Sequence, residues 1–176
     1  MSKVITFSRV FPKYHPKEGQ PTYFVEKLTK CFHVDNIHKL FDVPVPDFDE
    51  AIYHLSHGKR HTIRAGRRWK KGDIFSPRVW SDKPYKSKQI IIAPDTVITS
   101  THLFEIYSTD KHCHILIDGK EWSSSNGNDF DSLMWNDGLS PDDFRHWFQL
   151  SPEYQKNKSF QGQIICWSDA VSYGCS

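Results

Sequence analysis

A lysine, a threonine and an arginine follow Gly58 at short spacing, at positions 59, 62 and 64. Amide hydrolysis needs a nucleophile, a base that takes its proton and a positive group that stabilises the oxyanion. Thr62 could attack or position a water, while burial among arginines would shift Lys59 towards its neutral, basic form. The spacing alone is weak evidence, because a lysine three residues before a threonine commonly lies on a solvated strand edge.

The segment from Lys59 to Lys88 is strongly cationic, with eleven basic residues against two acidic ones. The whole chain has 23 basic and 21 acidic residues, so the remaining positions are acidic overall. A concentrated positive segment attracts polyanions, and flat rings among the cations can stack on bases. The competing interpretation is a solvated Lys/Arg face with aromatic core residues between the cations. The predicted ligand-binding residues are Arg9, Arg64, Arg67, Arg68, Trp69, Arg78 and Trp80.

Histidines and cysteines raise the question of a metal site. His54, His57 and His61 could share a helical face, and residues 112–114 form a His-Cys-His triplet. Neither group has the ligand number and spacing of a zinc site, so we expect no metal and no cofactor. The cysteines contain no Cys-x-x-Cys pair, which favours free thiols over a disulfide framework at positions 31, 113, 166 and 175.

Length and composition are those of a single globular domain. The chain has 176 residues, of which 38% are hydrophobic and 14% aromatic, enough for one aromatic-rich core. No apolar run approaches the roughly 20 residues that span a bilayer. The N-terminal residues lack the apolar stretch of a secretory signal. These features predict a cytoplasmic protein without membrane contact, and they leave the oligomeric state open.

Short strands and helices are predicted around this chemistry. Runs of β-branched and aromatic residues predict strands over 4–11, 74–80, 89–93, 97–107, 114–118 and 161–167. Apolar spacing and caps predict helices over 22–32, 50–57, 129–136 and 140–148. In the last of these, Ser140 is the predicted N-cap and Pro141 lies in the first turn. The order predicts an α+β fold, a small curled β-barrel flanked by short helices.

The chain resembles a known family, the ASCH domain, a relative of the PUA-like barrels that handle RNA and modified nucleotides. The family's opening strand resembles residues 7–11, and its Gly-Asp pair resembles residues 72–73. Its Gly-Lys-x-x-Thr-x-Arg signature corresponds to Gly58, Lys59, Thr62 and Arg64. The resemblance implies one PUA-like domain over residues 1–176, with an insertion or elaboration at about 12–48.

The bacterial branch that this spacing most resembles hydrolyses the amide of cytidine acylated on its exocyclic amine, using a Lys, a Thr and a Glu. The resemblance implies that Lys59 and Thr62 hold the first two roles. The nearest carboxylate to the third is Asp137, one methylene shorter than Glu. Asp137 also suits a turn ahead of Gly138. Two hypotheses follow: an amidohydrolase of a modified nucleoside, and an RNA-binding or ribonuclease-like module that uses the basic aromatic segment 59–88.

Overall fold

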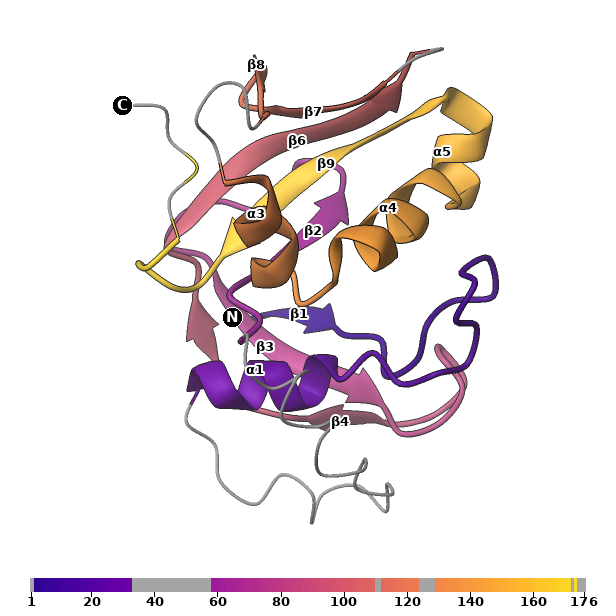
Figure 1. Ribbon diagram of the computed structural model, residues 1–176. Helices are drawn as coiled ribbons and strands as arrows, with labels where there is room; N and C mark the ends of the chain where they lie inside the picture. The colour runs from indigo at the N-terminus through magenta and orange to yellow at the C-terminus, as the bar shows by residue number, and fades with distance from the viewer. Residues whose placement is uncertain (1, 33–57, 110–111, 124–128, 172, 174–176) are drawn as a thin grey trace.

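A computed structural model describes residues 2–32, 58–109, 112–123, 129–171 and 173, which form two β-sheets and four helices (Figure 1). The predicted helix over 50–57, positions 33–48 of the expected insertion, and Cys175 lie outside the described residues. Within the described ranges, no helix is long and apolar enough to cross a membrane.

The first sheet is built around β3 (Ile74–Trp80). This strand pairs in parallel with β1 (Lys3–Thr6) and antiparallel with β4 (Gln89–Ile91) and β5 (Thr96–Val97). Alternation along β3 buries Phe75 and Val79 on one face and leaves Ile74 exposed on the other. The N-terminal strand is shorter than predicted, and the chain from residue 7 onward leads to the helix α1.

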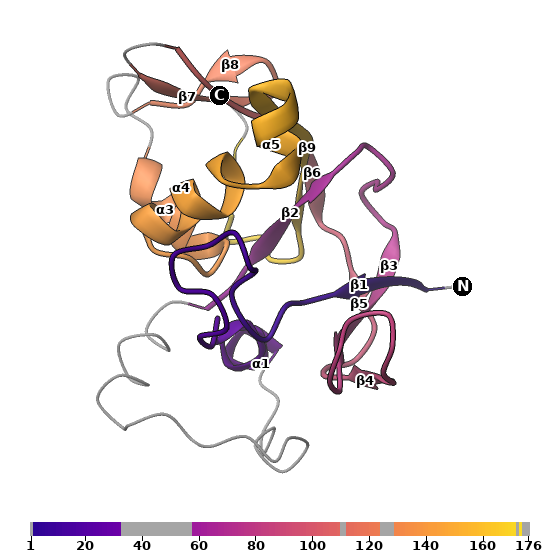
Figure 2. The same ribbon diagram turned by 90° about the vertical axis from the view of Figure 1, so that its right-hand side faces the viewer.

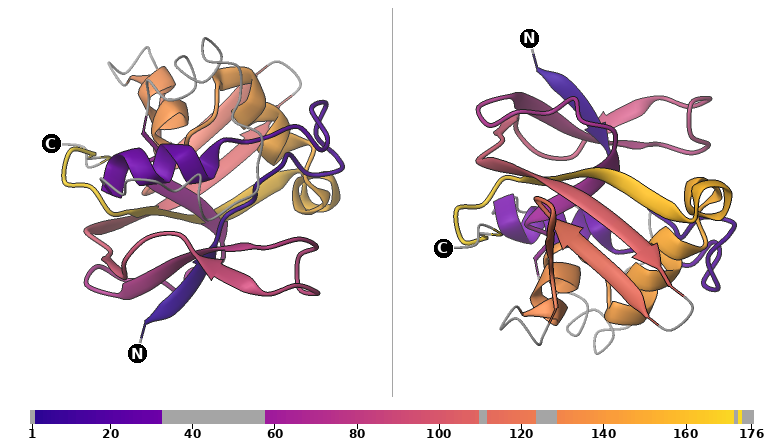
Figure 3. Two further views of the ribbon diagram at one scale, coloured as in Figure 1. Left: turned by 90° about the horizontal axis from the view of Figure 1, so that it is seen from below. Right: turned by 90° about the horizontal axis from the view of Figure 1, so that it is seen from above.

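The second sheet is antiparallel and has the strand order β2-β9-β6-β7-β8. Its central strands are the long β6 (Ser100–Ser108) and β9 (Ser159–Cys166). The short strand β2 (His61–Ala65) pairs with β9 at one side, while β7 (Cys113–Ile117) and β8 (Lys120–Glu121) continue the sheet at the other. Seen from above, the first sheet lies beyond β9 (Figure 3, right).

Four helices cover the sheets. The first, α1 (Phe24–Phe32), lies beside the first sheet, whereas α3 (Phe130–Asn136), α4 (Pro141–Gln149) and α5 (Pro152–Asn157) lie along the second (Figure 2). Ser140 caps α4 by accepting from the Asp143 amide, as predicted. Phe144 and Phe148 of α4 pack on Phe104 of β6 in the core.

The predicted α+β class is confirmed, but the predicted β-barrel is not. Among the described residues, the strands form two separate hydrogen-bonded sheets rather than one barrel. The split follows from β3, which hydrogen-bonds to β1, β4 and β5 and makes no ladder with β2. The lysine and threonine of the signature are therefore placed by the second sheet, at the start of β2.

Candidate functional site

Lys59 and Asp137 form a buried ion pair between β2 and the end of α3. The Lys59 Nζ lies 2.8 Å from Asp137 Oδ1, and it also donates to the Asp137 carbonyl. Both side chains are almost fully shielded, at 1% and 6% exposed. The backbone fixes their approach, because the Lys59 amide donates to the Lys27 carbonyl of α1 and the Arg60 amide donates to the Asn136 carbonyl. The structure therefore brings together two of the three predicted catalytic residues.

A second buried lysine supports the same turn. Lys27 of α1 donates to the Gly138 carbonyl at 2.7 Å, directly after the carbonyl that Lys59 contacts. Gly138 has a φ of +81°, which favours glycine. An added Cβ there would lie 3.4 Å from the side chains of Lys27, Lys59 and Phe24. The turn thus favours glycine for its backbone conformation, whereas an added Cβ would only come into van der Waals contact with its neighbours.

Burial controls the ionisation of this cluster. It lowers the pKa of Lys59 and raises that of Asp137, although each opposes the shift of the other. It also lowers the pKa of Lys27 to about 8, with the nearby Lys59 charge adding to the effect. Lowered lysine and raised carboxyl pKa values are typical of acid-base sites, and equally of buried ion pairs with a structural role.

Two further polar residues of β2, His61 and Arg64, act on Asp137 of the pair. His61 is fully buried, and its Nε2 lies 3.8 Å from Asp137 Oδ1. Its other ring nitrogen, Nδ1, is hydrogen-bonded to the Tyr173 hydroxyl at 2.7 Å. Burial lowers its pKa well below the ordinary value, so it is neutral. Thr62 is also buried. Arg64 donates to the Thr6 carbonyl and stacks on Phe7, with its guanidinium carbon 5.4 Å from the ring centroid.

Aromatic rings separate this cluster from a neighbouring cavity. The Lys59 ammonium lies 4.3 Å from the centroid of Phe24. Phe7 and Phe24 in turn line a cavity of about 430 Å³, called the first cavity here, whose lining does not include Lys59, Thr62 or Asp137. A substrate in this cavity would meet the rings before the charged pair.

The first cavity has the size and lining of a small-ligand site. It lies between the end of β1, the start of α1 and the end of β3. Tyr23, Phe24 and Trp80 supply aromatic surface, whereas Arg9, Glu26 and Asp82 supply hydrogen-bonding groups. Cavities of several hundred cubic ångströms with mixed linings of this kind hold ligands of nucleoside size. The Arg9 guanidinium also donates to the Ser81 carbonyl at 3.2 Å, which joins the two sides of the cavity.

The cationic segment does not form one patch. Lys59 and Arg64 point into the protein, Arg60 precedes β2, and Arg78 lies within β3. The other seven cations form two groups, one before β3 and one after it. The turn cluster before β3 consists of Arg67, Arg68, Lys70 and Lys71. The hairpin cluster after β3 consists of Lys83, Lys86 and Lys88. All seven residues are exposed, and the hairpin cluster adjoins the first cavity, because Asp82 and Pro84 line it.

The other predicted ligand-binding residues lie in different surroundings. Trp80 lines the first cavity and packs against Tyr85, with 5.3 Å between the ring centroids. Trp69 is only 3% exposed and is part of the core, so it offers no stacking face to a ligand. Arg68 packs on the Trp69 ring instead. The Arg78 guanidinium donates hydrogen bonds to the Ser76 hydroxyl at 3.2 Å and to the Gln89 side-chain oxygen at 3.3 Å.

Sequence reasoning missed Lys27, Tyr23 and Phe24, and considered His61 only as a metal ligand. The alternation of a strand could have placed His61 beside Lys59, two residues earlier. No local signal marks Lys27 as buried, because its partner Gly138 is 111 residues away. No group of three or more potential metal-ligating residues occurs in the described part of the chain, while His54 and His57 lie outside it.

Comparisons with models of known protein families, with curated proteins and with solved structures found no match. The site must therefore be interpreted from its own geometry and chemistry.

Proposed function

We propose that the protein binds single-stranded nucleic acid, with an unpaired base in the first cavity and phosphates on the hairpin cluster. The observation that carries the proposal is the position of Trp80 and Arg9 in a cavity of about 430 Å³ next to Lys83, Lys86 and Lys88. Single-strand binding sites combine stacking rings with a cationic path for the backbone. Glu26 and Asp82 supply acceptors for the exocyclic amino groups of bases. The ASCH resemblance, and with it a PUA-like origin of the two sheets, agrees with such a ligand.

We expect an RNA oligonucleotide to bind more weakly as salt rises, and Trp80→Ala to weaken binding about tenfold through lost stacking. Replacing all three lysines of the hairpin cluster by Gln should reduce the slope of log affinity against log salt by about 2, since each single-strand phosphate contact contributes about 0.7. Fluorescence anisotropy at several salt concentrations measures both effects.

The matched control replaces three exposed lysines of the second sheet and its helix, Lys120, Lys156 and Lys158, by Gln, and should leave the slope unchanged. A slope that falls only when the turn cluster is neutralised would place the ligand at the other end of β3 and contradict the proposal. No binding by wild-type protein at low salt would contradict it outright.

A second candidate function is hydrolysis of an acylated cytidine, favoured by the buried Lys59–Asp137 pair, with Thr62 also buried on the neighbouring strand β2. The chemistry requires the Phe24 ring to move, because that ring lies between the first cavity and the Lys59 ammonium. Transfer of the shared proton from Lys59 to Asp137 would give a neutral amine and a carboxylic acid. The amine would take a proton from the attacking water, or from Thr62, whose acyl ester a water would then hydrolyse, and Asp137 would donate its proton to the leaving amine.

If the protein is such a hydrolase, acetylated cytidine should be converted to cytidine, and Thr62→Val should reduce turnover by about 100-fold or more, as expected for loss of a nucleophile or its positioning group. Thr101→Val is the matched control, because Thr62 and Thr101 both pair with Ile165 and share one face of the sheet. Chromatographic release of cytidine gives the rates. Equal turnover in both variants would exclude Thr62 from the chemistry, and no turnover in wild-type protein would leave binding as the function.

A further inference from the structure

A second cavity of about 270 Å³ adjoins the first. The two linings share Pro21 and Tyr23, so the segment before α1 forms a common ridge between the cavities. Tyr23 adopts a left-handed backbone conformation, with a φ of 56°, which is uncommon outside glycine. Backbone strain of this kind persists only where the surrounding structure fixes it, and it concentrates at binding sites. Pro21 and Tyr23 thus form the ridge that separates the two cavities.

The second cavity is lined by aromatic rings, as the first is, but it holds two lysines where the first holds one arginine. Tyr23, Trp135 and Phe11 supply rings, and Lys17 and Lys27 supply ammonium groups against one carboxylate, Asp143. Lys27 is 96% buried and held by the Gly138 carbonyl, so its ammonium group has a fixed position in the wall. The pKa of Lys27, about 8, leaves it mostly protonated at neutral pH.

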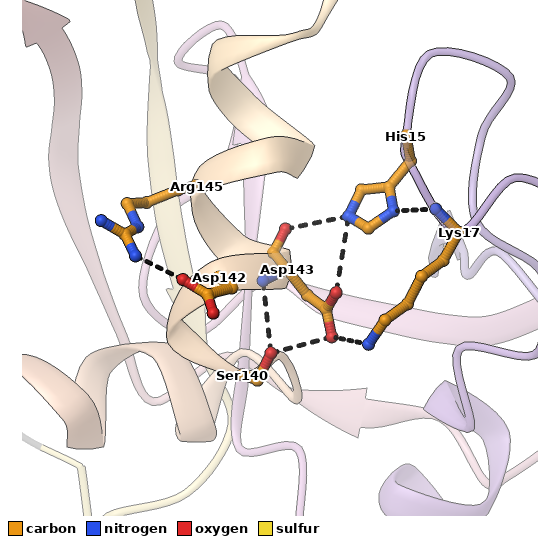
Figure 4. Close-up of polar contacts among 6 residues, drawn as sticks. All are labelled: His15, Lys17, Ser140, Asp142, Asp143 and Arg145. Carbon is orange, nitrogen blue, oxygen red and sulfur yellow. Dashed lines mark hydrogen bonds and ion pairs between the residues drawn. The ribbon is translucent and has the colours of Figure 1, made fainter.

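The single carboxylate in the wall is compensated (Figure 4). Asp143 Oδ2 accepts from Lys17 Nζ at 2.9 Å and from Ser140 Oγ at 2.8 Å, at the start of α4. The His15 ring, stacked on Phe11, holds the Lys17 segment in place through contacts with the Lys17 amide and the Asp143 carbonyl. The cavity thus keeps a net positive charge in spite of its buried carboxylate.

We infer that the second cavity binds the nucleotide next to the one in the first cavity, so that the site recognises two consecutive unpaired nucleotides whose linking backbone crosses the Tyr23 ridge. This inference rests on the proposed function and narrows its ligand from any base to a dinucleotide step. Trp135 and Tyr23 would contact the second base, while Lys17 and Lys27 would donate to its ring and carbonyl acceptors or to its phosphate.

The test compares two probes of equal charge. A dinucleoside monophosphate and the methyl ester of a mononucleotide each carry one phosphodiester, so a difference in affinity reports the second nucleoside. We expect the dinucleoside monophosphate to bind about tenfold more tightly, as one further stacked base would provide. In Lys27→Met and in Lys17→Gln that gain should fall, while the methyl ester keeps the affinity it has for wild-type protein. Isothermal titration calorimetry measures both ligands on the whole protein.

If Lys27→Met impairs folding because Lys27 is buried, Lys17→Gln still tests the second cavity. The Lys17 side chain is 45% exposed, so its replacement should leave the fold intact. Equal affinities of the two probes for wild-type protein would overturn the inference and leave the proposed function intact. If both variants still bind the dinucleoside monophosphate about tenfold more tightly than the methyl ester, the second cavity does not bind the second nucleotide. If neither probe binds, the inference and the proposed function both fail.

Discussion

Lys59→Met should lower the free energy of unfolding by about 3–5 kcal/mol, the usual loss when one partner of a buried ion pair is removed. Methionine fills nearly the same space, so the loss comes chiefly from Asp137, whose carboxylate would remain buried without its closest cation. Arg64 also stabilises the Asp137 charge, and His61, being neutral, gives little help. Denaturant unfolding of the two proteins at neutral pH measures the difference.

The pH dependence of the same variant identifies the cause. Burial raises the pKa of Asp137 in the folded protein, and removing Lys59 raises it further, so the folded state binds a proton before the unfolded state does as pH falls. A group with a raised folded pKa stabilises at low pH and loses that contribution as pH rises. The deficit of Lys59→Met should therefore shrink below neutral pH. A deficit that is constant with pH would indicate lost packing instead.

Two further variants complete the test. Adding Asp137→Leu to Lys59→Met removes both charges and should recover most of the lost stability, because apolar replacements of a whole buried pair are often neutral or better. Lys120→Met, at an exposed position, controls for the substitution itself and should change stability by less than about 0.5 kcal/mol. A loss below about 1 kcal/mol in Lys59→Met would contradict a charged buried pair.

The pair costs desolvation energy that a hydrophobic pair would not, so stability alone is a poor reason for its presence. It joins α1, β2 and the turn after α3, because the Lys59 backbone contacts Lys27 and its side chain contacts Asp137. The same turn contributes Gly138 to the second cavity. The pair therefore fixes one wall of the second cavity.

Local signals in the sequence predicted several of the elements near the site, but not β2, which none of the predicted strands covers. The strand over 74–80 is confirmed as β3, and the helix over 140–148 is confirmed as α4 with one more residue at its end. Both have strong local determinants, alternation in one case and a Ser-Pro cap in the other. The same Ser-Pro signal occurs at residues 151–152, where it begins the short helix α5, and it was overlooked.

Contacts distant in sequence set the limit of prediction. The cations between Lys59 and Lys88 were expected to act together, but strand alternation and the length of β3 divide them, and only the tertiary fold shows which ones face solvent. Trp69 illustrates the same point: its exposed neighbours suggest a surface ring, whereas its side chain packs against Phe75 in the core. The proximity of Asp137 to Lys59 came from the family resemblance, since no spacing rule links residues 78 positions apart.

Gly162→Ala should be the most damaging small substitution in the second sheet. Gly162 lies in β9 between Ala65 of β2 and Phe104 of β6. A Cβ at this position would lie 2.2 Å from the Arg64 carbonyl oxygen, and this is a backbone atom that no rotamer change can move. Forcing the strands apart should cost about 3 kcal/mol, at the upper end of overpacking penalties.

We expect the backbone strain in Gly162→Ala to reach the first cavity as well, through Arg64. Its guanidinium holds the Thr6 carbonyl at the end of β1, next to Phe7 in the first cavity. A shift of the Arg64 backbone loosens that contact, so Gly162→Ala should lower stability and also weaken the proposed nucleotide binding. Gln161→Ala, at the exposed neighbouring position, is the matched control and should change neither measurably. Equal stability of the two variants would show that β2 and β9 can separate freely, and the close approach would then not position Arg64.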